Sequence, residues 1–362
     1  MQIYNQTRYV SEFTQGMDPA GREFLSLVVK GTFDFPDTPQ DRPRACKEQR
    51  PPVMADEFTG EPGFSATLWE TDFAFRKHRC DVILQGAAHA PGGKPAEKVR
   101  VGLKVGGWSK TIDVLGHREW RNVGPKAVAT RPQQFVRQPF SYDTAFGGPD
   151  RLDPDNDKPD VYRPNPVGRG WSDGRNPDRL PGLPLPNTQM PDEDVRSPYG
   201  TYRPAAFGPI GRGWPQRLKY GGTYDQNWID NIFPFLPPDF DERYYQSAPE
   251  DQQIDPPATG AEVVIVNLSH NGREAFRLPE TNLPITVFRR RDIVFEKTVR
   301  PDTLTFDTEA RVFSMVWRID VPILRIITEF TEAWIGAPTR AMERARATGK
   351  TYIRRPALQE SA

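Results

Sequence analysis

The sequence predicts a mainly β protein with antiparallel β-sheets in a sandwich-like arrangement, a long ordered segment rich in proline and glycine, and a short C-terminal helix. Three observations predict this class: short β-branched and aromatic runs in residues 22–120, similar runs in 261–320, and a proline-rich stretch between them. We divide the chain, which can still form one compact unit, into an N-terminal β region (1–124), an ordered coil (125–258), a C-terminal β region (259–325) and a helical basic tail (326–362).

The composition is that of a folded protein. Of the 362 residues 36% are hydrophobic and mean hydropathy is -0.67, but 21 Phe, 11 Tyr and 8 Trp supply large apolar surfaces. Lys plus Arg equals Asp plus Glu at 48 each, so we expect no nucleic-acid or membrane partner. Two cysteines are too few for a disulfide framework, and no signal peptide or long apolar run occurs. We therefore expect a cytoplasmic location.

The β regions contain strands joined by short turns. The clearest unit is "VRVGLKVGGWSKTIDVL", residues 99–115, where Gly106 and Gly107 can take the positive φ of a tight antiparallel hairpin. In the C-terminal β region, "EVVIVNLS", "PITVFRR", "DIVFEKTV" and "RVFSMVWRIDV" follow one another with turns between them. This spacing indicates antiparallel sheet rather than alternating strands and helices.

Residues 125–257 contain 23 of the 38 prolines. Because proline fixes φ and lacks an N–H, neither a helix interior nor a central strand continues through it. Aromatic residues nevertheless recur throughout this stretch, so we predict an ordered coil that packs across the strands rather than a disordered linker. One helix is predicted in "YDQNWIDNIF", where Trp228, Ile232 and Phe233 have helical spacing before Pro234.

This coil holds three glycine and proline clusters: "YDTAFGGPD" (142–150), "NPVGRGW" (165–171) and "FGPIGRGWPQR" (207–217). None has the Gly-x-Gly-x-x-Gly order between a strand and a helix that aims backbone donors at a phosphate. We interpret them as consecutive sharp turns pinned by aromatic side chains, which form a recognition or packing surface. The residues predicted to contact a partner are Phe146, Arg169, Trp171, Arg212 and Trp214, with burial in the protein's own core as the alternative for the aromatic ones.

No motif predicts catalysis, a cofactor or a metal site. Asp153, Asp155 and Asp157 begin like a calcium loop, but Lys158 stands where the turn glycine belongs and Pro164 where the closing glutamate belongs. We therefore favour an exposed acidic turn and leave calcium binding open. The four histidines have no metal-ligand spacing. We expect no enzyme activity; a hydrolase or lyase whose acids and histidines meet only in the fold is the alternative.

The tail "APTRAMERARATGKTYIRR" predicts a helix after Pro338 that ends near Gly349. Its "GKT" matches the end of a nucleotide-binding loop, but Arg344 occupies the position of the required earlier glycine. Basic residues dominate, so the tail presents either a solvated helix face or a dock for an acidic partner. These residues are Arg340, Arg344, Arg346, Lys350, Arg354 and Arg355.

A series of motifs in order carries a family resemblance from about Phe24 to about Arg318. They include "VVKGTFDF", "TDFAFRKHRCDVILQGAAHAPGG", "GHREW", "PFSYDTAFGGPD", "NPVGRGW", "LPNTQMP", "FGPIGRGWPQR", "GGTYDQNW", "FPFLPPDFDERYYQSAPEDQQ" and "VVIVNLSHNG". The chain resembles a bacterial domain-of-unknown-function family encoded beside type VI secretion genes, whose members act as adaptors, or chaperones, for secreted effectors. The resemblance implies contacts with an effector and with spike proteins of the VgrG or PAAR type, and no catalytic residues. A structural component of the secretion particle is a further alternative.

Overall fold

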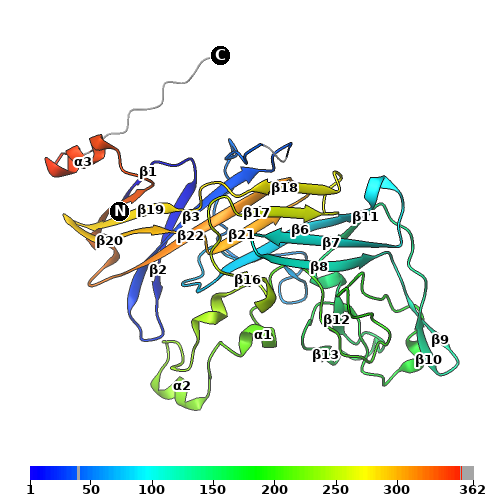
Figure 1. Ribbon diagram of the computed structural model, residues 1–362. Coiled ribbons are helices and arrows are strands. Elements are labelled where there is room, and N and C mark those ends of the chain that lie inside the picture. The colour runs from blue at the N-terminus through cyan, green and yellow to red at the C-terminus, as the bar shows by residue number, and fades with distance from the viewer. Residues whose placement is uncertain (39–40, 351, 353–362) are drawn as a thin grey trace.

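Three β-sheets form the framework of the molecule, and long coil segments cover them (Figure 1). The computed structural model describes residues 1–38, 41–350 and 352. The predicted fold class is confirmed, since the chain is mainly β with antiparallel and mixed sheets, an ordered coil rich in proline and a short helix near the C-terminus.

The largest sheet has seven strands and joins the two predicted β regions. Its order is β11-β6-β21-β22-β3-β2, and the short β16 adds to β6. β22 lies antiparallel to β3 from the Val312–Asp34 pair to the Pro322–Phe24 pair, whereas β21 lies parallel to β6. The strands are β2 (Val10–Met17), β3 (Glu23–Asp34), β6 (Cys80–His89), β11 (Arg137–Phe140), β16 (Gln253–Ile254), β21 (Thr303–Asp307) and β22 (Val312–Pro322).

The second sheet has five strands in the order β15-β8-β7-β17-β18. It contains the predicted hairpin, in which Gly106 has a φ of +58° while Gly107 keeps an ordinary φ. β17 from the C-terminal region pairs antiparallel with β7 of that hairpin. The strands are β7 (Lys98–Val105), β8 (Trp108–Leu115), β15 (Thr188–Gln189), β17 (Glu262–Val266) and β18 (Arg273–Arg277).

The third sheet has four strands and corrects the prediction for the tail. Its order is β1-β23-β19-β20, with β1 (Gln2–Asn5), β19 (Leu283–Arg289), β20 (Asp292–Val299) and β23 (Phe330–Ile335). β23 lies within the segment that was expected to be helical, and it pairs antiparallel with β19 and parallel with β1. Helix α3 (Arg340–Ala347) forms later in the tail, where Thr339 caps it through a bond from the Met342 N–H.

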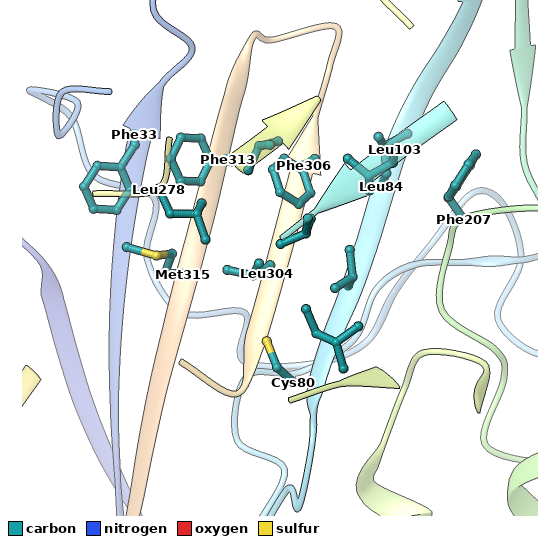
Figure 2. Close-up of a cluster of buried hydrophobic side chains, with 14 of the residues drawn as sticks. Phe33, Cys80, Leu84, Leu103, Phe207, Leu278, Leu304, Phe306, Phe313 and Met315 are labelled. Atoms are coloured by element: carbon teal, nitrogen blue, oxygen red, sulfur yellow. The ribbon is translucent and has the colours of Figure 1, made fainter. Parts of the chain in front are cut away.

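One apolar core lies between the sheets. It combines inward side chains of the seven-stranded sheet, such as Leu304, Phe306 and Phe313, with Leu103 of the five-stranded sheet (Figure 2). The Phe313 ring stacks on that of Phe276 in β18, with centroids 5.2 Å apart. This contact between sheets explains the sandwich-like arrangement, because each sheet buries one apolar face against the other.

The other face of the seven-stranded sheet is polar and is covered by coil. Asp81 is fully buried there and accepts hydrogen bonds from the Gln246 amide and from the backbone and hydroxyl of Ser247, at 2.7–3.0 Å. The Gln252 amide in turn donates to the Val82 carbonyl. Hydrogen bonds to the sheet therefore hold part of the proline-rich coil in place, because buried polar groups need partners.

Short elements order the remaining coil. The two-stranded ladders and small sheets are built from β4 (Glu57–Phe58), β5 (Thr67–Trp69), β9 (Trp120–Val123), β10 (Lys126–Ala129), β12 (Phe146–Pro149), β13 (Val161–Tyr162) and β14 (Arg169–Gly170). The helical elements are α1 (Pro215–Leu218), α2 (Gln226–Asn231), η1 (Pro91–Gly93), η2 (Tyr142–Thr144), η3 (Pro177–Arg179), η4 (Glu242–Tyr245), η5 (Glu250–Gln252) and η6 (Ile327–Glu329). The helix predicted from "YDQNWIDNIF" is thus present as α2.

Candidate partner-binding surface

The first two glycine clusters pair with each other as strands rather than forming separate turns. β12 and β14 lie parallel, with Phe146 opposite Arg169 and Gly147 opposite Gly170. Gly148 has a φ of +88°, and a Cβ added to it would lie 2.0 Å from the Gly168 carbonyl oxygen. Glycine is therefore required by a close backbone approach, and not by a ligand.

Two of the predicted contact residues are buried in the protein itself. Phe146 packs edge-on against Tyr162 and Tyr202, with ring centroids 5.1 and 4.9 Å away. Trp214 makes an edge contact with Tyr142, and both rings are buried in a second small cluster. These side chains hold the coil together, so neither contributes to an exposed surface.

Trp171 and Arg169 are half-buried. The Trp171 ring lies beside Tyr162 at a centroid distance of 6.0 Å and packs against the same cluster as Phe146. Arg169 lies in β14, and burial lowers the pKa of its guanidinium. Its Nε is buried without a hydrogen-bond partner in the described part of the chain. Trp171 therefore belongs to the internal packing, whereas Arg169 is half-buried without an ion pair among the described residues.

Arg212 forms ion pairs within the protein. Its guanidinium donates to both Asp56 oxygens, at 2.8 and 3.1 Å, and lies 2.8 Å from Glu70. Hydrogen bonds and the charges of these two acids raise the pKa of Arg212 against the opposing effect of burial, so it stays cationic. A guanidinium committed to two carboxylates joins the coil to the region around β5 and has little capacity for a partner.

The structure exposes a different set of apolar side chains, Tyr224, Ile229, Phe233 and Phe235, around the half-buried Trp228. We name these five residues the α2 surface. Trp228 lies between Tyr224 and Phe233, with ring centroids 4.7 and 5.5 Å away. Ile229 is 57% exposed and Phe233 is 66% exposed. Neighbouring exposed aromatic and aliphatic side chains are typical of protein contact sites.

The α2 surface is held in a defined conformation. Asp225 caps α2 by accepting from the Trp228 N–H at 2.8 Å, and the Trp228 indole donates to the Phe235 carbonyl at 2.8 Å. Asp239 accepts two hydrogen bonds from Thr223, and these lower the pKa of Asp239. They also join the two ends of the segment that carries the α2 surface. The exposed rings are thus fixed in place before any partner binds, which reduces the entropic cost of binding.

This surface also carries acidic charge. Asp225, Asp230 and Asp239 lie in the segment, and neither lysine nor arginine occurs between Tyr220 and Arg243. In Figure 1, α2 lies at the lower edge of the molecule, beside the end of the β2–β3 hairpin. Consistent with this view, a Cβ added to Gly21 in that hairpin turn would come within 2.9 Å of the Phe235 ring. The sequence feature that could have indicated this surface is the run of acidic and aromatic residues without a lysine or arginine.

Some charged side chains of the acidic turn and the basic tail are engaged within the protein. Asp153 accepts a hydrogen bond from Arg179 at 3.1 Å, and no group of three or more histidine, cysteine or acidic side chains there is arranged to hold a metal ion. Arg346 lies 3.5 Å from the Phe288 ring centroid and pairs with Glu332. Two further predicted tail residues, Arg354 and Arg355, lie outside the described residues, as does Thr351 of the "GKT" match.

The fold and this surface define the class: a multi-sheet β protein whose covering coil exposes an acidic, aromatic surface. A family model described as uncharacterized protein conserved in bacteria (DUF2169) matches residues 20–318, so the chain belongs to the DUF2169 family. The match includes the α2 surface and ends before β23. No curated protein and no solved structure matches the chain. Among the described helices, none has the length and apolar character needed to cross a bilayer.

Proposed function

We propose that this protein is a cytoplasmic adaptor that binds a type VI secretion effector and assists its loading onto a VgrG or PAAR spike protein, without catalysis. The motif resemblance between Phe24 and Arg318 supports this proposal from the sequence. The structural observation that carries it is the α2 surface, because Tyr224, Phe233 and Phe235 are exposed and the segment that carries them is already ordered. An adaptor needs such a surface and needs no catalytic group.

The chemistry of the surface specifies the partner segment. Apolar side chains of the effector would cover Ile229 and Phe233, which are the most exposed members of the α2 surface. Lysine or arginine side chains flanking that segment would pair with Asp225 and Asp230 at the rim. Rim charges mainly increase the association rate and select the partner, whereas the buried rings supply most of the affinity.

The test is affinity purification of the tagged chain from the native bacterium under conditions where the secretion system is expressed. We expect mass spectrometry to identify an effector and a VgrG or PAAR protein with the unmodified chain. The variant Ile229→Ser with Phe233→Ser should lose the effector. The matched control is Ile293→Ser, which alters an isoleucine of similar exposure, 54%, on β20.

Three results would contradict the proposal. Recovery of neither an effector nor a spike protein would oppose the adaptor function itself. Equal recovery with the double variant and with the control would show that the α2 surface is not the binding site. Retention of the chain in purified secretion particles at fixed stoichiometry would favour a structural component, since an adaptor should leave before firing.

A further inference from the structure

A cavity of about 570 Å³ lies over the polar face of the seven-stranded sheet, and none of the α2 surface residues lines it. Its floor consists of side chains from adjacent strands, Lys30 of β3, Ser314 of β22 and Thr305 of β21. The volume lies within the range of small-molecule sites in proteins. Segments around Val53 and Trp69 form its walls.

The two lysines of the cavity differ in how many of their donors the protein uses. Lys77 Nζ donates to Asp81 at 2.7 Å, and it also lies 3.1 Å from Thr303 and 3.5 Å from Ser247. Lys30 Nζ donates to Asp72 at 2.8 Å and to no other atom of the described residues, although its side chain is 7% exposed. Since an ammonium group has three N–H donors, Lys30 keeps two for another acceptor.

Three of the four carboxylates that line the cavity are engaged, and the fourth, Glu57, is exposed on β4. Glu70 receives both Arg217 and Arg212, and Asp56 receives Arg212 and the Thr71 N–H. Asp72 Oδ2 accepts from Lys30 and from the Val53 N–H. The engaged oxygens of Asp56, Glu70 and Asp72 therefore offer little capacity for a cationic ligand. Glu57 is a single exposed carboxylate, which does not by itself form a cation site.

The remaining donors favour an anionic ligand. Arg50 uses Nη2 for Asp307 at 2.9 Å, and its other guanidinium N–H groups have no partner among the described residues. The Thr305 hydroxyl and the Trp69 indole N–H likewise have no hydrogen-bond partner in the described parts of the chain. Lys30 and Arg50 are each paired with one carboxylate, but both keep free cationic N–H donors in one cavity, and such donors can bind an oxyanion.

The walls determine what else the ligand carries. Val53, Trp69, Ile83 and three prolines, Pro51, Pro52 and Pro209, contribute apolar surface around these donors. A phosphate or sulfate ion alone would leave that surface uncovered. We propose that the cavity binds a small carboxylate with an apolar body, whose carboxylate accepts from Lys30, Arg50 and Thr305 while its body packs against the walls. Binding there does not depend on the adaptor function.

The test uses hexanoate as the probe and hexanamide as its neutral match, with the full chain and ligand-observed NMR titration. We expect hexanoate to bind in the millimolar range and hexanamide at least about tenfold more weakly. Lys30→Gln should abolish binding, but it also leaves Asp72 without its cation. Arg50→Gln and Thr305→Val are therefore the decisive variants, each expected to weaken binding by about fivefold or more.

The control is Lys104→Gln, which alters an exposed lysine paired with Glu262 outside the cavity and should bind hexanoate normally. Inorganic phosphate is titrated in parallel and should compete only weakly with hexanoate for the cavity. The proposal is overturned if hexanoate does not bind, if hexanamide binds equally well, or if both decisive variants bind hexanoate like the unmodified chain.

Discussion

Arg217 and Glu70 form a buried ion pair with two parallel hydrogen bonds, Nη1 to Oε2 at 2.6 Å and Nη2 to Oε1 at 2.9 Å. Arg217 lies in α1 within the proline-rich coil, and Glu70 follows β5 in the N-terminal region. The remaining guanidinium donors reach the carbonyls of Ile210 and Tyr244. This pair therefore joins segments that are distant in the sequence and fixes the coil on the sheets.

Loss of this pair should destabilise the fold. Arg217→Met leaves Glu70 buried beside a single remaining cation, and we expect the free energy of unfolding to fall by about 3–5 kcal/mol in urea titrations. Lys219→Met removes an exposed partner of Glu250 and should cost less than about 1 kcal/mol. Equal losses in both variants would contradict a structural role for the buried pair.

Substitutions of the aromatic residues in the coil should fall into two groups, according to how much they lower the free energy of unfolding. Phe146→Ala removes a ring enclosed by Tyr162 and Tyr202 and should lower the free energy of unfolding by about 3–5 kcal/mol. Phe233→Ala alters a ring that is mostly exposed, so its effect should stay within about 0.5 kcal/mol. Chemical denaturation of both variants checks this, and a large loss for Phe233→Ala would show that the α2 surface is structural.

The close approach of two backbone segments should make Gly148 essential for stability. In Gly148→Ala the new Cβ would meet the Gly168 carbonyl at a positive φ, so we expect a loss of at least about 2 kcal/mol in stability. Gly107→Ala is the matched control, because nothing lies within 4 Å of a Cβ there and its φ is ordinary. If thermal unfolding shifts equally in both variants, the close approach of β12 and β14 is refuted.

Asp320 should make stability depend on pH. Burial raises its pKa to about 6, although Arg76 lies 3.4 Å away. The folded state therefore binds this proton more tightly than the unfolded state, so the Asp320 contribution to stability is present at low pH and is lost as pH rises from about 4 through 6. We compare the free energy of unfolding of Asp320→Asn with that of the unmodified chain in urea titrations. The difference, in favour of the variant, should increase by on the order of 2 kcal/mol between pH 4 and pH 7.5. A pH-independent difference would contradict this.

The sequence was sufficient for local structure. The β7–β8 hairpin follows from Gly106, and α2 follows from the spacing of Trp228 before Pro234. It was insufficient for strand order, because β22 pairs with β3 across a large separation, as in the Ser314–Thr32 contact at 282 residues. The β23 strand was missed for the same reason, since its partners β1 and β19 lie far from it in the chain.

Burial within the coil could not be read from local composition. Phe146 and Phe233 both lie near proline or glycine, yet only Phe146 meets Tyr162 and Tyr202. Arg212 likewise looks free in "GPIGRGW" until Asp56 and Glu70 are placed beside it. The cavity was equally hidden, because Lys30 reads as an ordinary strand residue and acquires its role only when coil covers the outer face of the sheet.

The order of strands in the seven-stranded sheet has a consequence for biosynthesis. β3 leaves the ribosome early, but its neighbour β22 is translated only near the end, and β21, the parallel partner of β6, appears shortly before it. The nascent chain must therefore hold two long apolar strands without their final neighbours through most of translation. This sheet can therefore be completed only when translation is nearly finished, and its early strands expose apolar surface until then.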